Sequence, residues 1–112
     1  MKLSVGIITF NEERIIAKTI DAVKNIAGEI VIIDSNSTDK TVEIAKSKGA
    51  KVITQSWLGY GKQKNFMIDN CSGEWILSID ADEIISQELA NEISEEIKKE
   101  NNISEVYELR EK

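Results

Sequence analysis

The sequence predicts an α/β domain of the Rossmann-like class, with a mainly parallel sheet flanked by helices. Short runs rich in Ile and Val alternate along the chain with segments of helical periodicity. Such alternation is typical of parallel strands connected by helices. The 112 residues have the length of one domain or of part of one. The hydrophobic fraction of 41% supports a folded core and argues against a disordered chain.

The strands are expected where apolar and β-branched residues gather. Residues 3–10 predict the first strand, and residues 30–33 predict a second one that is buried on both faces. Shorter runs predict strands at residues 51–54 and 75–79, and residues 106–109 are expected to begin a fifth. Right-handed crossovers between these strands would place helices on the faces of the sheet.

Helix starts are expected at residues that can cap them. Asn11 is interpreted as an N-cap followed by acidic residues in the first turn, where the helix dipole favours negative charge. Ser37 or Thr38 is expected to cap a second helix that ends at Gly49. Residues 62–70 are predicted to form a third helix.

The fourth helix has the clearest signal. Ser86 is its expected N-cap. Apolar residues then recur every four positions with charged residues opposite them, and these are Ile85, Leu89, Ile93 and Ile97. This pattern is typical of a helix that packs one face on a core and exposes the other to solvent.

The composition excludes several classes of function. Lys and Arg total 14 against 20 Asp and Glu, a net charge of −6 without a basic stripe, so nucleic acid is not an expected partner. The absence of histidine removes His-based triads and zinc-protease motifs. Cys71, the one cysteine, is expected to be a small buried hydrophobe rather than a nucleophile.

Motifs of other nucleotide-binding classes are missing from the sequence. There is neither a G-x-G-x-x-G nor a G-K-[ST] motif, which argues against a dehydrogenase and a P-loop NTPase. The apolar start is short and is interpreted as a strand rather than a signal peptide. No apolar run approaches the roughly 20 residues needed to span a bilayer. A soluble, cytoplasmic protein is therefore expected.

Polar and acidic side chains follow the predicted strands. They occupy residues 9–13, 34–39 and 80–83. These are the carboxyl ends of strands, where open α/β sheets bind their ligands. Unpaired carboxylates at such an edge call for a cation, a donor-rich ligand or both.

Asp80 and Asp82 are the most informative pair at this edge. In an extended chain, residues i and i+2 point to the same side, and two close carboxylates repel each other unless a cation lies between them. Oxygen ligands suit Mg²⁺ or Mn²⁺, which take further ligands from phosphates. The alternative is a solvated acidic turn in which Asp82 or Glu83 helps to cap the next helix.

Three other features each have two interpretations. Asp34 either makes a turn or cap, or accepts hydrogen bonds from a nucleobase or ribose. Lys62 and Lys64, near a helix start, either neutralise phosphate or are solvated. Trp57 and Tyr60 either stack on a ligand or pack beneath their loop, and packing is the favoured alternative.

Four segments in register resemble family 2 glycosyltransferases of the GT-A fold. They are VGIITFNEE at residues 5–13, VIIDSNSTDKT at 31–41, WLGYGKQKN at 57–65 and GEWILSIDADE at 73–83. The third segment is similar, more narrowly, to lipopolysaccharide core enzymes of the β-1,4-glucosyltransferase type. The resemblance covers residues 2–90 and implies a domain that binds a nucleotide sugar.

The resemblance also implies an activity and a set of site residues. The activity is inverting transfer from a nucleoside diphosphate sugar, often UDP-linked, to a saccharide or lipid-linked acceptor. The positions that match the nucleoside pocket are Thr9, Phe10, Asn11, Glu13 and Asp34. Those that match the rest of the donor site are Lys64, in a basic-Asn pair near the donor, Asp80 beside the ribose and metal, and Asp82 as a ligand of Mg²⁺ or Mn²⁺.

Two departures from the family pattern limit these expectations. Many members carry two consecutive acids after the second strand, whereas Ser35 takes the second position here, so the nucleobase is not fixed. The chain is also shorter than the usual member, so residues 1–112 are expected to be an incomplete N-terminal domain without the catalytic general base. We therefore expect donor and metal binding with poor transfer, unless another polypeptide completes the site.

The sequence is compatible with several alternatives. One is a non-catalytic nucleotide-sugar-binding module or one part of a split enzyme. Others are a sugar-nucleotide nucleotidyltransferase, which would need a glycine-rich basic loop after the first strand, and a structural domain with an acidic pocket. An unpaired strand near the carboxyl terminus would favour self-association. A lipid-linked acceptor would favour peripheral association with the inner face of the cytoplasmic membrane.

Overall fold

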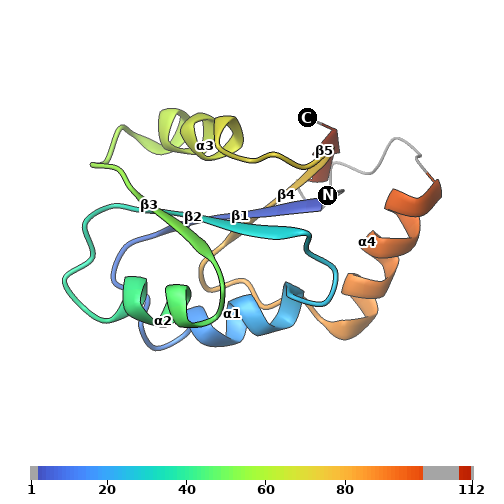
Figure 1. Ribbon diagram of the computed structural model, residues 1–112, viewed down its shortest axis with the longest axis horizontal. Coiled ribbons are helices and arrows are strands. Elements are labelled where there is room, and N and C mark those ends of the chain that lie inside the picture. Colours follow the sequence, from blue (N-terminus) through green and yellow to red (C-terminus); the bar gives the residue numbers. More distant parts are fainter. Residues whose placement is uncertain (1–2, 100–108, 112) are drawn as a thin grey trace.

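The strands form one sheet in the order β3-β2-β1-β4-β5 (Figure 1). The computed structural model describes residues 3–99 and 109–111. The strands are β1 (Leu3–Thr9), β2 (Glu29–Asp34), β3 (Lys51–Thr54), β4 (Trp75–Asp80) and β5 (Leu109–Glu111). The first four run parallel, and β5 pairs antiparallel with β4. The predicted α/β class with a mainly parallel sheet is confirmed.

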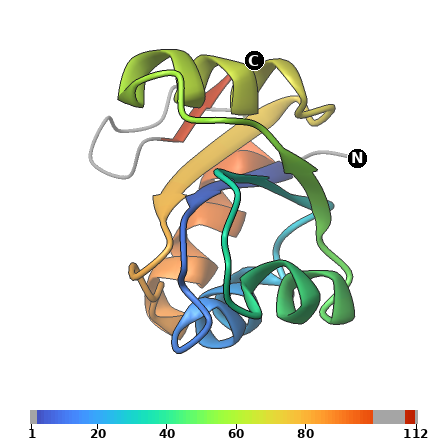
Figure 2. The same cartoon turned by 90° about the vertical axis from the view of Figure 1, so that its left-hand side faces the viewer.

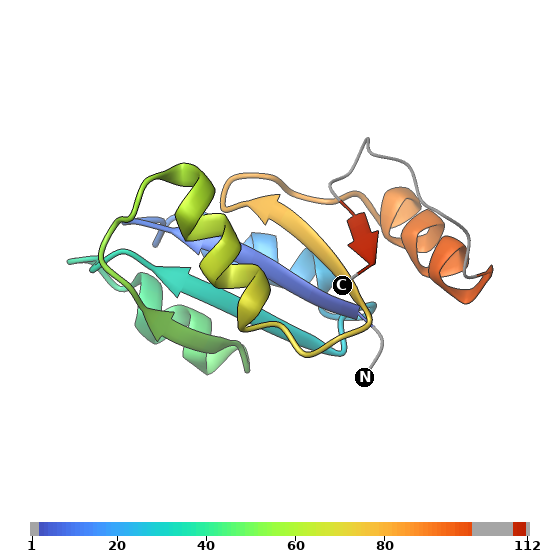
Figure 3. The same cartoon turned by 90° about the horizontal axis from the view of Figure 1, so that it is seen from above.

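The four helices of the described residues cover the two faces of the sheet unequally (Figures 1 and 2). One face carries α1 (Ile16–Val23), α2 (Thr41–Ser47) and α4 (Gln87–Lys99). The other carries α3 (Tyr60–Asp69), which lies across β1 and β2 (Figure 3). None of the helices in residues 3–99 has the length and apolar character of a membrane-spanning segment.

The predicted strands agree with the structure to within a residue or two at their ends, except for the fifth. The described part of that strand is Leu109–Glu111, while residues 106–108 of the prediction lie outside the described residues. An unpaired strand was expected near the carboxyl terminus. The described strand there, β5, is instead paired with β4.

Two of the three predicted helix caps are wrong. Helix α1 begins at Ile16 rather than after Asn11, and α2 begins at Thr41 rather than after Thr38. The residues predicted as caps, Asn11 and Ser37 or Thr38, instead form hydrogen bonds between the two loops. At the start of α2 it is Asp39 that accepts from the Thr41 N–H, at 2.9 Å. The third cap is confirmed, because the Leu89 N–H donates to Ser86 Oγ at 3.1 Å at the start of α4.

The core has one layer on each side of the sheet. Ile and Val residues of β1 and β2 face α1 on one side, together with Ile85, Ile93 and Ile97 from α4 and the turn before it. The smaller layer lies beneath α3 and contains Val31, Ile33, Met67, Cys71 and Ile76. Cys71 is buried there, as predicted for a small hydrophobe.

Glu29 fastens the amino-terminal edge of the sheet. Its carboxylate accepts hydrogen bonds from the Ser4 hydroxyl at 2.5 Å and from the Ser72 N–H at 2.6 Å. Burial acts to raise the pKa of Glu29, but these hydrogen bonds, a third from the Ser72 hydroxyl and the charge of Lys51 outweigh it, and the pKa lies below its ordinary value. The carboxylate thus ties β1, β2 and the turn before β4 together.

Candidate donor-binding site

The candidate site lies at the carboxyl ends of β1, β2 and β4, the edge that faces the viewer in Figure 2. Loops 10–15, 35–40, 55–59 and 81–86 meet at this edge. The parallel register aligns Thr9 with Asp34 and Ile8 with Asp80, so the three strands end at nearly the same level. This alignment brings together polar groups that are far apart in the sequence.

Asp34 is buried at this edge and already has partners. Only 1% of its surface is exposed, and Oδ1 accepts from Thr9 Oγ1 at 2.6 Å and from Ser37 Oγ at 2.6 Å. The Ser37 N–H donates to Oδ2 at 2.8 Å. Thr9 is buried beneath it and turned toward it. Both residues therefore support the loop after β2 in this structure, and their contact with a nucleoside stays a prediction.

Asn11 joins the loop after β1 to the loop after β2. Its Oδ1 accepts from the Thr38 N–H at 2.8 Å and its own N–H donates to Ser37 Oγ at 2.8 Å. The Asn11 φ angle is +52°, a left-handed conformation that asparagine tolerates better than most residues. The predicted cap is thus a bridge between two loops, with partners 26 or 27 positions away.

Acidic side chains add further hydrogen bonds between the loop after β1 (residues 10–15) and the loop after β2 (residues 35–40), which together are called the double loop. Asp39 accepts from the Thr41 hydroxyl at 2.5 Å and from the Glu13 N–H at 3.2 Å, while the Glu13 carboxylate accepts from the Lys40 N–H at 3.3 Å. Desolvation acts to raise the pKa of Asp39, but the hydrogen bonds from Thr41 and Glu13 outweigh it and hold the pKa below its ordinary value. Glu13 was predicted to lie in the nucleoside pocket. In the structure its carboxylate accepts from the Lys40 N–H, and its contact with a nucleoside stays a prediction.

Asn11→Ala should destabilise the protein by about 2 kcal/mol, because it removes a loop-bridging hydrogen bond and leaves a side chain that disfavours positive φ. Asn11→Gly should recover the backbone part of that loss and keep the hydrogen-bond part of about 1 kcal/mol. Urea denaturation of the two variants measures the difference. Equal losses for alanine and glycine would contradict the assigned left-handed conformation.

Asp80 and Asp82 are both exposed, with buried Ala81 between them. The chain does not stay extended here, because the Glu83 N–H donates to the Asp80 carbonyl at 3.0 Å and closes a turn. The Glu83 carboxylate accepts from the Asp80 N–H at 3.1 Å. The extended geometry predicted for the pair is therefore wrong, and neither Asp82 nor Glu83 caps α4, since Ser86 does so.

The charges around Asp82 fit an open divalent-cation site. Burial raises the pKa of Glu12, and the negative charges of nearby Asp82 and Asp39 raise it further. In residues 3–99 and 109–111, no lysine or arginine forms an ion pair with Glu12, Asp80 or Asp82. The same residues contain no group of three acidic or sulfur side chains arranged to enclose a metal ion. Mg²⁺ commonly uses one or two carboxylates and completes its shell with water and phosphate.

A cavity of about 390 Å³ opens beside these loops and is lined by Phe10, Ser35 and Trp57. Phe10 is 56% exposed and Trp57 57% exposed, so both rings are accessible to a ligand. Tyr60 is 55% exposed. Packing beneath the loop, the favoured interpretation of Trp57 and Tyr60, is therefore wrong. Two accessible rings beside a hydroxyl suit a planar, polar-edged group such as a nucleobase.

Gln63 is a buried polar residue that sequence reasoning missed. Its side chain is 0% exposed. Oε1 accepts from the Leu58 N–H at 3.1 Å, while Nε2 donates to the Gln55 carbonyl at 3.1 Å and to Ser35 Oγ at 3.0 Å. It thus fixes the loop that carries Trp57 to helix α3. A glutamine between two lysines gives no local signal of burial.

Lys64 lies on α3. Its Nζ lies 5.8 Å from the centre of the Tyr60 ring, within the range of a cation–π contact. The side chain is half-buried, whereas Lys62 is exposed. Their role toward a phosphate stays a prediction.

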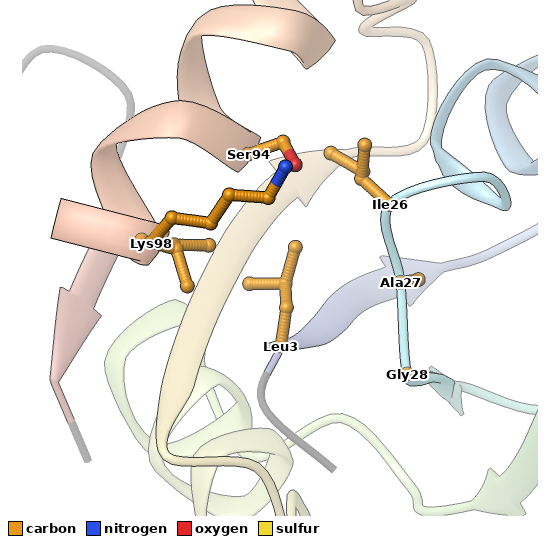
Figure 4. Close-up of a pocket in the computed structure, with 7 residues that line it drawn as sticks. Leu3, Ile26, Ala27, Gly28, Ser94 and Lys98 are labelled. Carbon is orange, nitrogen blue, oxygen red and sulfur yellow. The ribbon is translucent and has the colours of Figure 1, made fainter. Parts of the chain in front are cut away.

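A second cavity, of about 270 Å³, lies at the opposite edge, where β1 begins (Figure 4). Leu3, Ile26 and Ile97 give it an apolar wall, and Lys98 extends toward Ser94 at its rim. The predicted site residues are absent from its described lining. This cavity is therefore separate from the candidate site at the carboxyl edge of the sheet.

The structure is thus an α/β domain whose polar loops gather at the carboxyl edge of a mainly parallel sheet, and sequence comparison identifies its family. The family model "Glycosyl transferase family 2" matches residues 4–110, so the chain belongs to that family. An uncharacterized glycosyltransferase of Rickettsia typhi is 55% identical over 92 residues, which are 82% of this chain and 32% of that protein. The lipopolysaccharide core biosynthesis glycosyltransferase LpsC of Rhizobium meliloti is 38% identical over 94 residues, 80% of this chain and 34% of LpsC.

Solved structures agree with this assignment. S. aureus TarS 1-349 has a TM-score of 0.76 at 28% identity, over 88% of this chain and 33% of TarS. Glucosyl-3-phosphoglycerate synthase from Mycobacterium tuberculosis, in complex with Mn²⁺ and UDP-glucose, has a TM-score of 0.65 at 28% identity, over 72% of this chain and 33% of that one. The chain thus spans about a third of the length of the curated relatives that it matches.

Proposed function

We propose that this chain forms the donor-binding part of a glycosyltransferase that takes a sugar from a UDP-linked donor. The observation that carries the proposal is the position of the aromatic cavity beside an acidic edge without basic partners among the described residues. A nucleoside diphosphate has a planar base at one end and a metal-binding diphosphate at the other. The likeness to a synthase solved with Mn²⁺ and UDP-glucose supports this choice.

Each end of the donor has a set of residues suited to it. Phe10 and Trp57 would stack on the base. Asp82, with Asp80, would hold Mg²⁺ or Mn²⁺ through carboxylate oxygens, and the diphosphate would supply the remaining ligands. Lys64 would add positive charge beside the phosphates. The bound metal would act as a Lewis acid toward the diphosphate leaving group.

The double loop would serve as a rigid floor between these two ends. The loop after β2 is held by hydrogen bonds to Asp34 and Asn11, and the Thr9 hydroxyl in turn donates to Asp34. A binding site that is ordered before the ligand arrives avoids part of the entropy cost of binding. These residues would therefore support the donor site by positioning its backbone as well as by direct contact.

We propose a saccharide or lipid-linked acceptor, with lipopolysaccharide core synthesis as the setting. The 38% identity to LpsC supports that setting. A lipid-linked acceptor would bring the protein to the inner face of the cytoplasmic membrane. No described residue is assigned as the general base, so turnover would require a further polypeptide segment that contributes it.

Calorimetry of the chain with UDP tests the proposed function. We expect binding in the presence of Mn²⁺ that weakens markedly when EDTA removes the metal, because the diphosphate then meets uncompensated carboxylates. UDP affinity that is absent, or equal with and without Mn²⁺, would refute the proposal. A parallel sugar-transfer assay distinguishes an active transferase from a binding module, since both bind and only the first turns over.

A further inference from the structure

We propose that Thr19, on α1, is a positioning residue that holds the turn of Asp80 and Asp82 in the conformation that binds a divalent cation. The inference rests on the proposed function, because it concerns the metal-binding end of the same donor site. Thr19 itself would touch neither the donor nor the metal, since it is 0% exposed. It would act through the backbone of Ala81, to which its hydroxyl is bonded.

Thr19 is a polar residue on the buried face of α1. The other buried residues of this helix are the apolar Ile16, Ile20 and Val23. A hydroxyl buried among apolar side chains costs free energy unless it has a hydrogen-bond partner. A threonine within a helix ordinarily bonds the carbonyl four residues earlier, and the Ile15 carbonyl lies 3.2 Å from the Thr19 hydroxyl. That carbonyl already accepts from the Thr19 N–H at 3.1 Å, so it does not depend on the hydroxyl.

The Thr19 hydroxyl has a second acceptor 62 positions away in the sequence. It donates to the carbonyl oxygen of Ala81, the residue between Asp80 and Asp82. Ala81 is only 6% exposed and belongs to the same core cluster as the apolar residues of α1. The turn is therefore held to the core by the side chain and the backbone of its central residue, while the carboxylates on either side of it are exposed.

The position of this turn decides where the two carboxylates meet a cation. The hydrogen bond of 3.0 Å from the Glu83 N–H to the Asp80 carbonyl closes the turn on itself, but it does not fix the turn relative to the rest of the molecule. The hydrogen bond from Thr19 does so, because it joins the turn to a helix on a different part of the chain. Partners behind metal ligands matter because they orient the ligands, and their loss commonly weakens metal binding roughly 10- to 100-fold.

Calorimetry with UDP, at saturating Mn²⁺ and again in EDTA, tests the inference through the ratio of the two affinities. Thr19→Val keeps nearly the same side-chain shape and removes the hydroxyl, so it should lower this ratio roughly tenfold, the smaller end of the loss seen for outer-shell partners. In EDTA it should bind UDP as the unmodified chain does. Thr19→Ser retains the hydroxyl and should keep the ratio of the unmodified chain. All variants are compared at a temperature at which circular dichroism shows them to be folded.

Val23→Ala is the matched control for stability. Val23 is also 0% exposed and lies one turn further along α1, so its truncation weakens the packing of the same helix without removing the hydrogen bond to the turn. UDP binding should then keep its full dependence on Mn²⁺. A ratio that is unchanged in Thr19→Val, lost in Thr19→Ser, or lowered equally in Val23→Ala would overturn the inference while the proposed function stands.

Hydrogen exchange reports on the turn without any donor or metal. The Glu83 N–H, which is bonded to the Asp80 carbonyl, should exchange faster in Thr19→Val than in the unmodified chain. Its exchange should not change in Thr19→Ser or Val23→Ala, because an amide in an exposed turn exchanges through local opening rather than global unfolding. Equal exchange in all four proteins would overturn the role of Thr19. Failure of the unmodified chain to bind UDP in an Mn²⁺-dependent way would instead overturn the proposed function, on which the inference rests.

Discussion

Asp82→Asn should reduce Mn²⁺-dependent UDP binding by roughly 10- to 100-fold. Loss of even an outer-shell partner commonly weakens metal sites by that factor, and Asp82 is proposed as a direct ligand. Its carboxylate is exposed and has no ion pair among the described residues, so its charge is available to a cation. Calorimetric titration with UDP at saturating Mn²⁺ measures the loss.

The same substitution should have the opposite effect once EDTA is present. Without a cation, the Asp82 carboxylate repels the diphosphate, so removing its charge should leave UDP affinity unchanged or slightly raised. An effect whose sign depends on the metal is not expected of a residue that merely supports the fold. Folding itself should be preserved, because the negative charge of Asp82 is one of the causes that raise the pKa of Glu12 and is therefore unfavourable to that neighbour.

Asp69→Asn is the matched control for net charge. Asp69 is exposed and lies at the end of α3, and its substitution changes the chain by the same single charge. UDP binding should then keep its full dependence on Mn²⁺. If Asp82→Asn and Asp69→Asn lowered affinity equally, the effect would be one of overall charge and the carboxyl edge would not be a metal site.

The strands were predictable from sequence because their signal is local. Residues 30–33 are β-branched throughout, and only a strand buried on both faces accommodates such a run. The stripe of α4 and its Ser86 cap are equally local, because the partners lie within one turn of each other. The position of the candidate site was predicted from the parallel order of the strands, because open α/β sheets bind ligands at the carboxyl ends of their strands.

The loops were not predictable because their partners are distant in the sequence. Asn11 and Ser37 both have the chemistry of helix caps, yet they bond to each other's loop over 26 positions. Gln63 has the composition of a helix surface, but the fold buries it against Ser35 and Gln55. A single sequence contains no sign of such pairings. Local propensity identifies the polar residue, whereas tertiary structure decides which donor it meets.

Gly6→Ala should destabilise the protein by about 1–3 kcal/mol through overpacking. Gly6 lies in the central strand beneath α3, where an added Cβ would stand 2.0 Å from Met67 Sδ. Met67 is 0% exposed and belongs to the buried cluster that contains Cys71 and Ile76, so its side chain would have to shift within the core to admit the methyl group. Elsewhere in a strand, alanine would be the more favourable residue by about 0.5–1 kcal/mol, so the sign of the effect is informative. Chemical denaturation measures it.

Two further variants locate the cause of this loss. Gly61→Ala on the same α3 has nothing within 4 Å of its new Cβ and should stabilise the protein by about 0.5–1 kcal/mol. Met67→Ala alone should cost about 2–5 kcal/mol by leaving a cavity, but in combination with Gly6→Ala the new methyl occupies part of that space. The double variant should therefore lose less than the sum of the single losses. Additive losses would mean that Gly6 and Met67 do not compete for one volume.

The close approach of Gly6 to Met67 also connects the core to the candidate donor site. Met67 lies one turn after Gln63 on α3, and Gln63 holds the loop that carries Trp57. A methyl group at Gly6 that displaces α3 from the sheet should therefore also weaken UDP binding, although Gly6 itself is buried and does not line the cavity. Gly61→Ala should not do so. Equal UDP affinity in both glycine variants, despite a loss of stability in Gly6→Ala alone, would show that the donor site does not depend on how closely α3 approaches the sheet.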